Sequence, residues 1–307
     1  KGGLSVNKRA ARSLVLGSLL SVFIAVPVPA GAVEYQLFLL AMTAEGQPVV
    51  DLQADEVVID HAGDECSIKS LQLDSDPMKI ALLVDNSDSS SQSVNSLRDG
   101  LQSFLETLPA QHEIGLFTIS GQARRLEDFT TDRVALGEQV ARIFPDSGSG
   151  TLLRDGLVET WKRRFSDDDS WPVFVTVAYN GLEASRSVQD REFNEFINEL
   201  RARAATVHAV LVAARSGRGA TSLVQTEILT YLTDATGGNY SAIAAATALP
   251  NVLAELATSV GEQYEVIKDR YRVVFECDDD QPTQIRASVN RQPAVGVSLF
   301  PDRRTEP

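Results

Sequence analysis

The segment Asp85-Asn86-Ser87-Asp88-Ser89 holds a carboxylate and two hydroxyls in the pattern Asp-x-Ser-x-Ser. Carboxylate and hydroxyl oxygens are hard ligands, which suit Mg²⁺ or Ca²⁺ better than softer metals. The segment is therefore a candidate cation site. The same residue types are also common in turns and at helix N-caps, so a purely structural role is the alternative.

An apolar run precedes this segment and predicts how it is positioned. Residues 80–84 are continuously apolar, as is typical of a parallel strand that is buried on both faces. Open α/β sheets bind ligands in the crevice beyond the carboxyl ends of their strands. A loop that starts at Asp85 would therefore project its side chains into that crevice.

Strands and amphipathic helices alternate after Met78, which predicts an α/β fold with a doubly wound, Rossmann-like, mostly parallel sheet covered by helices on both faces. The predicted helix 94–108 has apolar residues at helical spacing and ends before Pro109. The further predicted strands are 114–119, 173–178 and 207–212, and the predicted helices are 94–108, 152–165, 193–200, 223–233 and 249–260.

Segments with β character flank this body and predict a small second domain. We expect residues 33–76 to form an N-terminal β segment that packs with a C-terminal β segment over residues 264–307, leaving 77–263 as the α/β domain. Cys66 and Cys277 are the two cysteines of the chain, one in each flanking segment. We expect them to form a disulfide, since cysteines tend to pair outside the cytoplasm; two free, buried thiols are the alternative.

Residues 1–32 have the pattern of a secretory signal peptide. Basic residues at Lys8, Arg9 and Arg12 precede an apolar stretch over 13–26, and small residues end the segment at Ala32. A retained membrane anchor is the alternative, but the apolar run is shorter than the roughly 20 residues that span a bilayer. We therefore expect cleavage near Ala32 and a secreted or periplasmic protein without a membrane span.

Composition narrows the class of partner. The 307 residues are 43% hydrophobic and 23% charged, which is ordinary for a globular protein, and the formal net charge is −14. Such an acidic body repels phosphate backbones, so nucleic acid is not an expected partner.

From Met78 to Gln263 the sequence resembles the von Willebrand factor type A (VWA) family. The resemblance rests on the order of strands and helices, the Asp85-x-Ser87-x-Ser89 loop, the Gly150-Thr151 step before a helix and a polar turn after the 173–178 strand. The flanking segments resemble a bacterial VWA-related subfamily of exported proteins, through the residues Gly46-Gln47-Pro48-Val49, Thr236-Gly237-Gly238 and Gln263-Tyr264.

The resemblance implies a metal-ion-dependent adhesion site. Ser87, Ser89 and Thr151 match the hydroxyl ligands of that site, and Asp85 matches an aspartate that acts largely through water. The implied cofactor is Mg²⁺, with Ca²⁺ or Mn²⁺ as alternatives, and a carboxylate of a protein partner completes the metal's coordination.

The last metal-site position departs from the family pattern. The family usually has an aspartate before glycine there, whereas this chain has Asn180-Gly181. An amide oxygen can still accept a hydrogen bond from a metal-bound water but brings no charge, so we expect weaker cation binding. Glu183 or Asp88 could compensate.

Other candidate residues favour structural roles. His208 lies within an apolar strand, as a core imidazole does. Asp155 follows Thr151 by one helical turn, and we expect its negative charge to interact favourably with the positive N-terminal end of a helix dipole. No set of nucleophile, base and orienting group can be assembled, so a hydrolase is the least favoured function. The leading hypothesis is a non-enzymatic interaction or adhesion module, and the second is a metal-free scaffolding VWA domain with a degenerate site.

Overall fold

The computed structural model describes residues 34–61, 63–165, 170–213, 223–277 and 285–300. The segment 1–32, predicted above as a signal peptide, lies outside these residues. Within the described ranges, no helix combines the length and the apolar composition that crossing a membrane requires.

One six-stranded sheet forms the centre of the α/β domain. Its strands are β4 (Met78–Val84), β5 (Glu113–Ser120), β6 (Gln122–Thr130), β7 (Trp171–Tyr179), β8 (Thr206–Val212) and β9 (Tyr240–Ile243), in the order β6-β5-β4-β7-β8-β9. All neighbouring strands are parallel except β6, which runs antiparallel to β5. The predicted mostly parallel sheet is confirmed.

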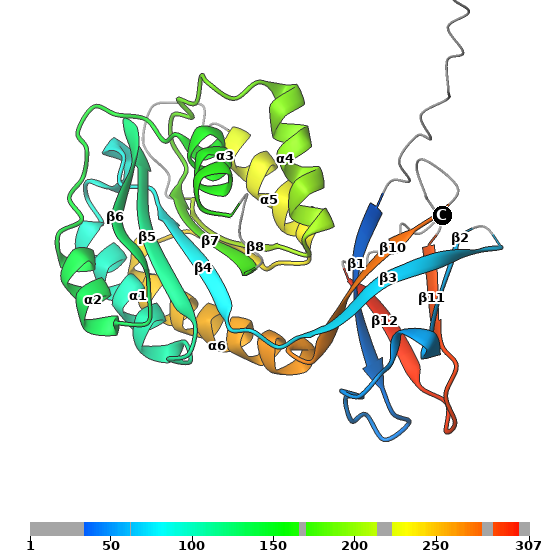
Figure 1. The fold of residues 1–307 in the computed structure, drawn as a ribbon. Coiled ribbons are helices and arrows are strands. Elements are labelled where there is room, and N and C mark those ends of the chain that lie inside the picture. Colours follow the sequence, from blue (N-terminus) through cyan, green and yellow to red (C-terminus); the bar gives the residue numbers. More distant parts are fainter. Residues whose placement is uncertain (1–33, 62, 166–169, 214–222, 278–284, 301–307) are drawn as a thin grey trace, which may run out of the picture. The chain divides into compact units, whose positions relative to one another are not determined.

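Helices cover both faces of this sheet (Figure 1). Successive residues of a strand point to opposite faces, and in β4 Leu82 packs in one apolar core whereas Leu83 packs in the other. The first core contains residues of α1 (Val94–Thr107), α2 (Arg133–Ala141) and α6 (Leu249–Ile267). The second contains residues of α3 (Leu153–Arg164), α4 (Asp190–Ala202) and α5 (Val224–Thr236).

Glycines end α5 and bring it back to the sheet. Gly237 has a φ of 80° at the C-cap, a left-handed conformation that glycine adopts without steric cost. A Cβ on Gly238 would lie 1.8 Å from the carbonyl oxygen of Val207 in β8. The pair therefore allows the chain to turn directly against the backbone of the sheet.

The segments that flank the α/β domain in sequence form a second, separate sheet, as predicted. Its strands are β1 (Glu34–Met42), β2 (Val57–His61), β3 (Asp64–Asp74), β10 (Arg270–Glu276), β11 (Ile285–Val289) and β12 (Gly296–Phe300), in the order β11-β2-β3-β10-β1-β12. Neighbouring strands are antiparallel. Since α6 extends to Ile267, the boundary expected at residue 263 falls inside this helix.

Cys66 and Cys277 form a disulfide in this second sheet. Cys66 belongs to β3, and Cys277 directly follows β10, the strand that pairs with β3. The two cysteines are 211 positions apart in the sequence. The bond therefore joins the segment before the α/β domain to the segment after it.

Candidate functional site

The carboxylate of Asp85 is buried at the carboxyl end of β4. The chain continues from β4 to β5 on one side and reaches β7 on the other, so Asp85 lies where the strand order reverses, the usual position of a ligand crevice. One oxygen of Asp85 accepts a 2.8 Å hydrogen bond from the amide of Ser87, and the other accepts a 3.0 Å bond from the amide of Tyr179. Burial raises the pKa of Asp85, and these hydrogen bonds oppose that change.

Thr151 reaches the same place from the loop before α3. Its hydroxyl donates a 2.7 Å hydrogen bond to Asp85 and lies 3.5 Å from the hydroxyl oxygen of Ser87. The amide of Thr151 bonds to the carbonyl of Leu182, which fixes the loop against the segment after β7. The structure therefore brings together Asp85, Ser87 and Thr151, three of the positions that the resemblance implies.

Ser89 lies beside the third loop of the site. It belongs to a short 3₁₀ turn, Asp88–Ser90, and its side chain is exposed. A Cβ placed on Gly181 would lie only 2.1 Å from the Ser89 hydroxyl oxygen, so this close approach depends on glycine. No hydrogen bond joins the Ser89 hydroxyl to the other predicted ligands among the described residues.

Asn180 follows β7 directly, at the predicted last position of the site. The backbone N–H of Asn180 donates a hydrogen bond to the carbonyl of Val212 at the end of β8. The side-chain oxygen is buried and has no hydrogen-bond partner within the described part of the chain. Buried acceptors are seldom left without a partner, so this oxygen fits a group that receives a hydrogen bond from a metal-bound water.

The two carboxylates that could compensate for Asn180 already bind backbone amides. Glu183 accepts bonds from Leu153 at the start of α3 and from Ser185, and burial raises its pKa. Asp88 accepts a 3.2 Å bond from Gly148. Among the described residues, no three or more His, Cys, Asp or Glu side chains gather as a metal site. A cation here would thus rely on hydroxyls and on one buried carboxylate.

Two structural expectations have different outcomes. His208 is buried in β8, where its Nδ1 accepts a 3.1 Å bond from the amide of Asn239, as expected for a core imidazole. Asp155 lies in the first turn of α3, but its carboxylate also accepts bonds from the amides of residues 186–188. The expectation for Asp155 was therefore incomplete: it also organises the loop before α4.

Gln225 belongs to the site region although the sequence interpretation overlooked it. It is fully buried at the start of α5, its side-chain oxygen accepts a 3.3 Å bond from the amide of Gly181, and its side-chain nitrogen has no described partner. The signal was present in the spacing, because Gln225 lies four residues before the buried Leu229 on the apolar face of the helix.

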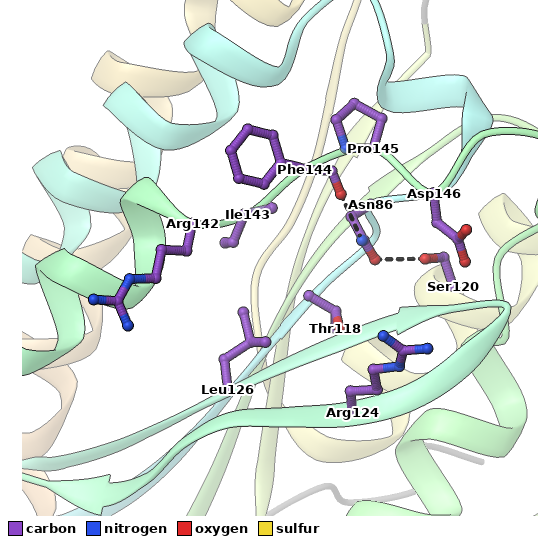
Figure 2. A pocket seen from close by; sticks show the side chains of 10 residues that line it. All are labelled: Asn86, Thr118, Ser120, Arg124, Leu126, Arg142, Ile143, Phe144, Pro145 and Asp146. Carbon is purple, nitrogen blue, oxygen red and sulfur yellow. Dashed lines mark hydrogen bonds between the residues drawn. The ribbon is translucent and has the colours of Figure 1, made fainter.

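A pocket of about 270 Å³ lies beside the Asp85 loop (Figure 2). One wall comes from the β5–β6 hairpin and the other from the segment after α2. Asn86 joins the two: its amide nitrogen donates to the carbonyl of Phe144, and its oxygen accepts a 2.5 Å bond from Ser120. The lining residues are Asn86, Thr118, Ser120, Arg124, Leu126, Arg142, Ile143, Phe144, Pro145 and Asp146.

A von Willebrand factor type A structure from Catenulispora acidiphila superposes on this chain with a TM-score of 0.51, at 9% identity over 79% of this chain and 75% of that one. The α/β domain has the VWA fold. The predicted fold is thereby confirmed. No protein-family model and no curated protein matches the sequence.

Two further structures are similar to this VWA-fold chain. An aerotolerance-related membrane protein from Bacteroides fragilis aligns with 59% of this chain and 99% of its own, at 10% identity and a TM-score of 0.46. Proximal thread matrix protein 1 of the mussel byssus, described with a zinc-occupied metal-ion-dependent adhesion site, aligns with 71% of this chain and 50% of its own, at 12% identity and a TM-score of 0.46.

Proposed function

We propose that the protein is an exported, non-enzymatic interaction module that binds a protein partner through a divalent cation, in the manner of a metal-ion-dependent adhesion site. Ser87, Ser89 and Thr151 would hold Mg²⁺, or Ca²⁺ or Mn²⁺, directly, and Asp85 and Asn180 through water. The bound cation supplies positive charge that attracts a carboxylate of the partner.

The observation that carries this proposal is the meeting of three loops at one edge of the sheet. The Thr151 hydroxyl lies within 3.5 Å of both Asp85 and the Ser87 hydroxyl. The side-chain oxygen of Asn180, which has no partner among the described residues, belongs to the adjacent loop after β7. Hydroxyl, carboxylate and amide oxygens are the donor set that hard divalent cations prefer.

Export is supported by the disulfide between Cys66 and Cys277, because such bonds persist in oxidising compartments. The basic and apolar pattern of residues 1–32 favours the same location.

Thermal unfolding of the protein with millimolar Mg²⁺, Mn²⁺ or Ca²⁺, and with EDTA, tests the proposal. A ligand that binds only the folded state stabilises it by about 2.7 kcal/mol at a hundredfold excess over Kd, which corresponds to a rise in Tm of about 5–10 °C for a domain of this size. We expect this rise to disappear in Ser87→Ala. Ser103→Ala is the matched control, because Ser103 is only partly buried in α1 and its hydroxyl bonds within its own helix.

A metal-free scaffolding domain is the second candidate, favoured by the neutral Asn180 and by the engagement of Glu183 and Asp88 with backbone amides. It predicts the same Tm with the cations and with EDTA. A rise in Tm that Ser87→Ala retains would place any cation elsewhere and would contradict the leading proposal.

A further inference from the structure

The pocket beside the Asp85 loop adjoins the candidate metal centre. Asn86 lies between Asp85 and Ser87 in the sequence and lines the pocket. Two bridges continue this wall, because Ser87 pairs with Asp146 and Thr151 pairs with Ser120. A ligand that reaches the metal centre would therefore have the pocket immediately next to it.

The walls of the pocket are held in place by bonds that need no ligand. The carbonyl of Ile143 accepts two bonds from the guanidinium of Arg98, at 3.0 and 2.6 Å, and the carbonyl of Phe144 accepts the bond from Asn86. The opposite wall belongs to the antiparallel β5–β6 pairing, whose register shifts at Leu126. The pocket is thus a built feature of the fold and does not depend on loop rearrangement.

Two solvent-exposed arginines line the pocket. Arg124 and Arg142 lie at opposite ends of it, separated by Leu126 and Ile143 (Figure 2). Neither guanidinium forms a hydrogen bond or an ion pair with a residue that the structure describes. Asp146 is the one acidic residue in the lining, so this pocket has a net positive formal charge on a chain whose total is −14.

The charge and size of the pocket favour a side chain of a protein partner. Sites for drug-sized small molecules have volumes of about 300–1,000 Å³, and this pocket, at about 270 Å³, is near the small end of that range. The rim carries the exposed aromatic ring of Phe144, 65% accessible, and aromatic residues are enriched at protein interfaces. Unpaired guanidinium groups recognise carboxylates.

We infer that this pocket receives a second acidic side chain of the protein partner, next to the one at the metal centre, with Arg124 as its main ionic contact. Arg142 extends the positive charge to the far end, and the partly buried Leu126 contacts the aliphatic part of the partner's side chain. The inference rests on the proposed function, because it concerns the same binding face. It adds that this face selects acidic segments of the partner. Arg124 is the end of the pocket that lies beside Ser120 and Asp146, the two residues that bridge to the metal-site loops (Figure 2).

Fluorescein-labelled synthetic peptides, measured by fluorescence polarisation with the full chain, test this inference. One series carries two glutamates separated by one, two or three valines, and a matched series has glutamine in place of the second glutamate. In millimolar Mg²⁺ we expect at least one spacing to bind about fivefold more tightly than its matched peptide, the gain of one partly exposed ion pair. Arg124→Gln should remove this gain.

Arg191→Gln is the matched control, since it removes the same charge from an exposed site on α4. Arg124 has no described partner, so its substitution should leave near-UV circular dichroism and Tm unchanged. Equal affinity of the paired peptides at every spacing, a gain that survives Arg124→Gln, or no measurable binding at millimolar concentration would each overturn the inference.

Repeating the titrations in EDTA separates this inference from the proposed function. If the metal proposal alone is wrong, the peptides bind equally with Mg²⁺ and EDTA, and the second glutamate still adds affinity that depends on Arg124. If the pocket inference alone is wrong, binding depends on Mg²⁺, but the second glutamate adds nothing.

Discussion

The hydroxyl of Thr151 donates a 2.7 Å hydrogen bond to the carboxylate of Asp85, although 66 positions separate the two residues in the chain. Both side chains are fully buried. Because the hydroxyl proton points to Asp85, the lone pairs of the Thr151 oxygen are directed elsewhere and remain available to a cation. This bond therefore serves the fold and, under the proposed function, would also orient a cation ligand.

Thr151→Val should separate these two roles. The substitution keeps the side-chain volume but removes one hydrogen bond from a buried carboxylate. We therefore expect the free energy of unfolding in EDTA to fall by about 1–3 kcal/mol. Any stabilisation by Mg²⁺ should also disappear. Urea unfolding with and without Mg²⁺ measures both quantities. Thr151→Ser, which retains the hydroxyl, should keep most of the cation effect, and its loss there would assign the effect to packing.

Asn180→Asp should change stability in opposite directions with and without cation. A second carboxylate near the buried Asp85 adds repulsion, so we expect a lower Tm in EDTA. With Mg²⁺ the added charge should tighten binding, by about tenfold if it contributes roughly 1.4 kcal/mol. Isothermal titration of Mg²⁺ measures the affinity directly. Asn194→Asp adds the same charge on the exposed side of α4, and an equal gain in that variant would show a nonspecific charge effect.

The continuous apolar runs of the sequence predicted the central strands because a parallel strand buried on both faces has no polar side to interrupt it. In β4, β7 and β8 every residue except Lys79 is buried. Elements with weak patterns were not predicted. The helix α2 buries only Leu136 and Val140, and β9 is a four-residue strand at the sheet edge without a buried residue.

The candidate site was predictable only where a local motif carried it. Asp85 and Ser87 belong to one short Asp-x-Ser-x-Ser motif, whereas Thr151 and Asn180 were placed beside them only by the resemblance to the VWA family. The pocket is lined by Arg124 from β6 and Arg142 from the segment after α2, a relationship that the fold creates and that spacing does not show. Spacing places Gln225 on the apolar face of α5, but the contact of its side chain with Gly181 depends on the fold.

The disulfide between Cys66 and Cys277 should contribute strongly to stability. Joining residues 211 positions apart removes about 5 kcal/mol of conformational entropy from the unfolded chain in the loop-closure treatment. We expect the double variant Cys66→Ala/Cys277→Ala to unfold at a clearly lower denaturant concentration. Denaturant unfolding of the oxidised protein, the reduced protein and the double variant measures this effect. Identical midpoints for all three would show that native contacts of β3 and β10 already hold the two segments together.

His208 should make the protein less stable in mild acid. Burial lowers the pKa of this imidazole from its usual 6.5 to about 4, and the neutral ring accepts the amide proton of Asn239 on Nδ1. Between these pH values the unfolded chain binds a proton that the folded chain refuses, so stability is fully present above pH 6.5 and falls as the pH decreases to about 4. The loss attributable to this one group is on the order of 3 kcal/mol.

Chemical denaturation across this pH range, compared with His208→Asn, isolates the contribution, because asparagine offers an acceptor near the Nδ1 position without titrating. The variant should show a shallower dependence on pH, whereas parallel curves for the two proteins would assign the acid sensitivity to other groups.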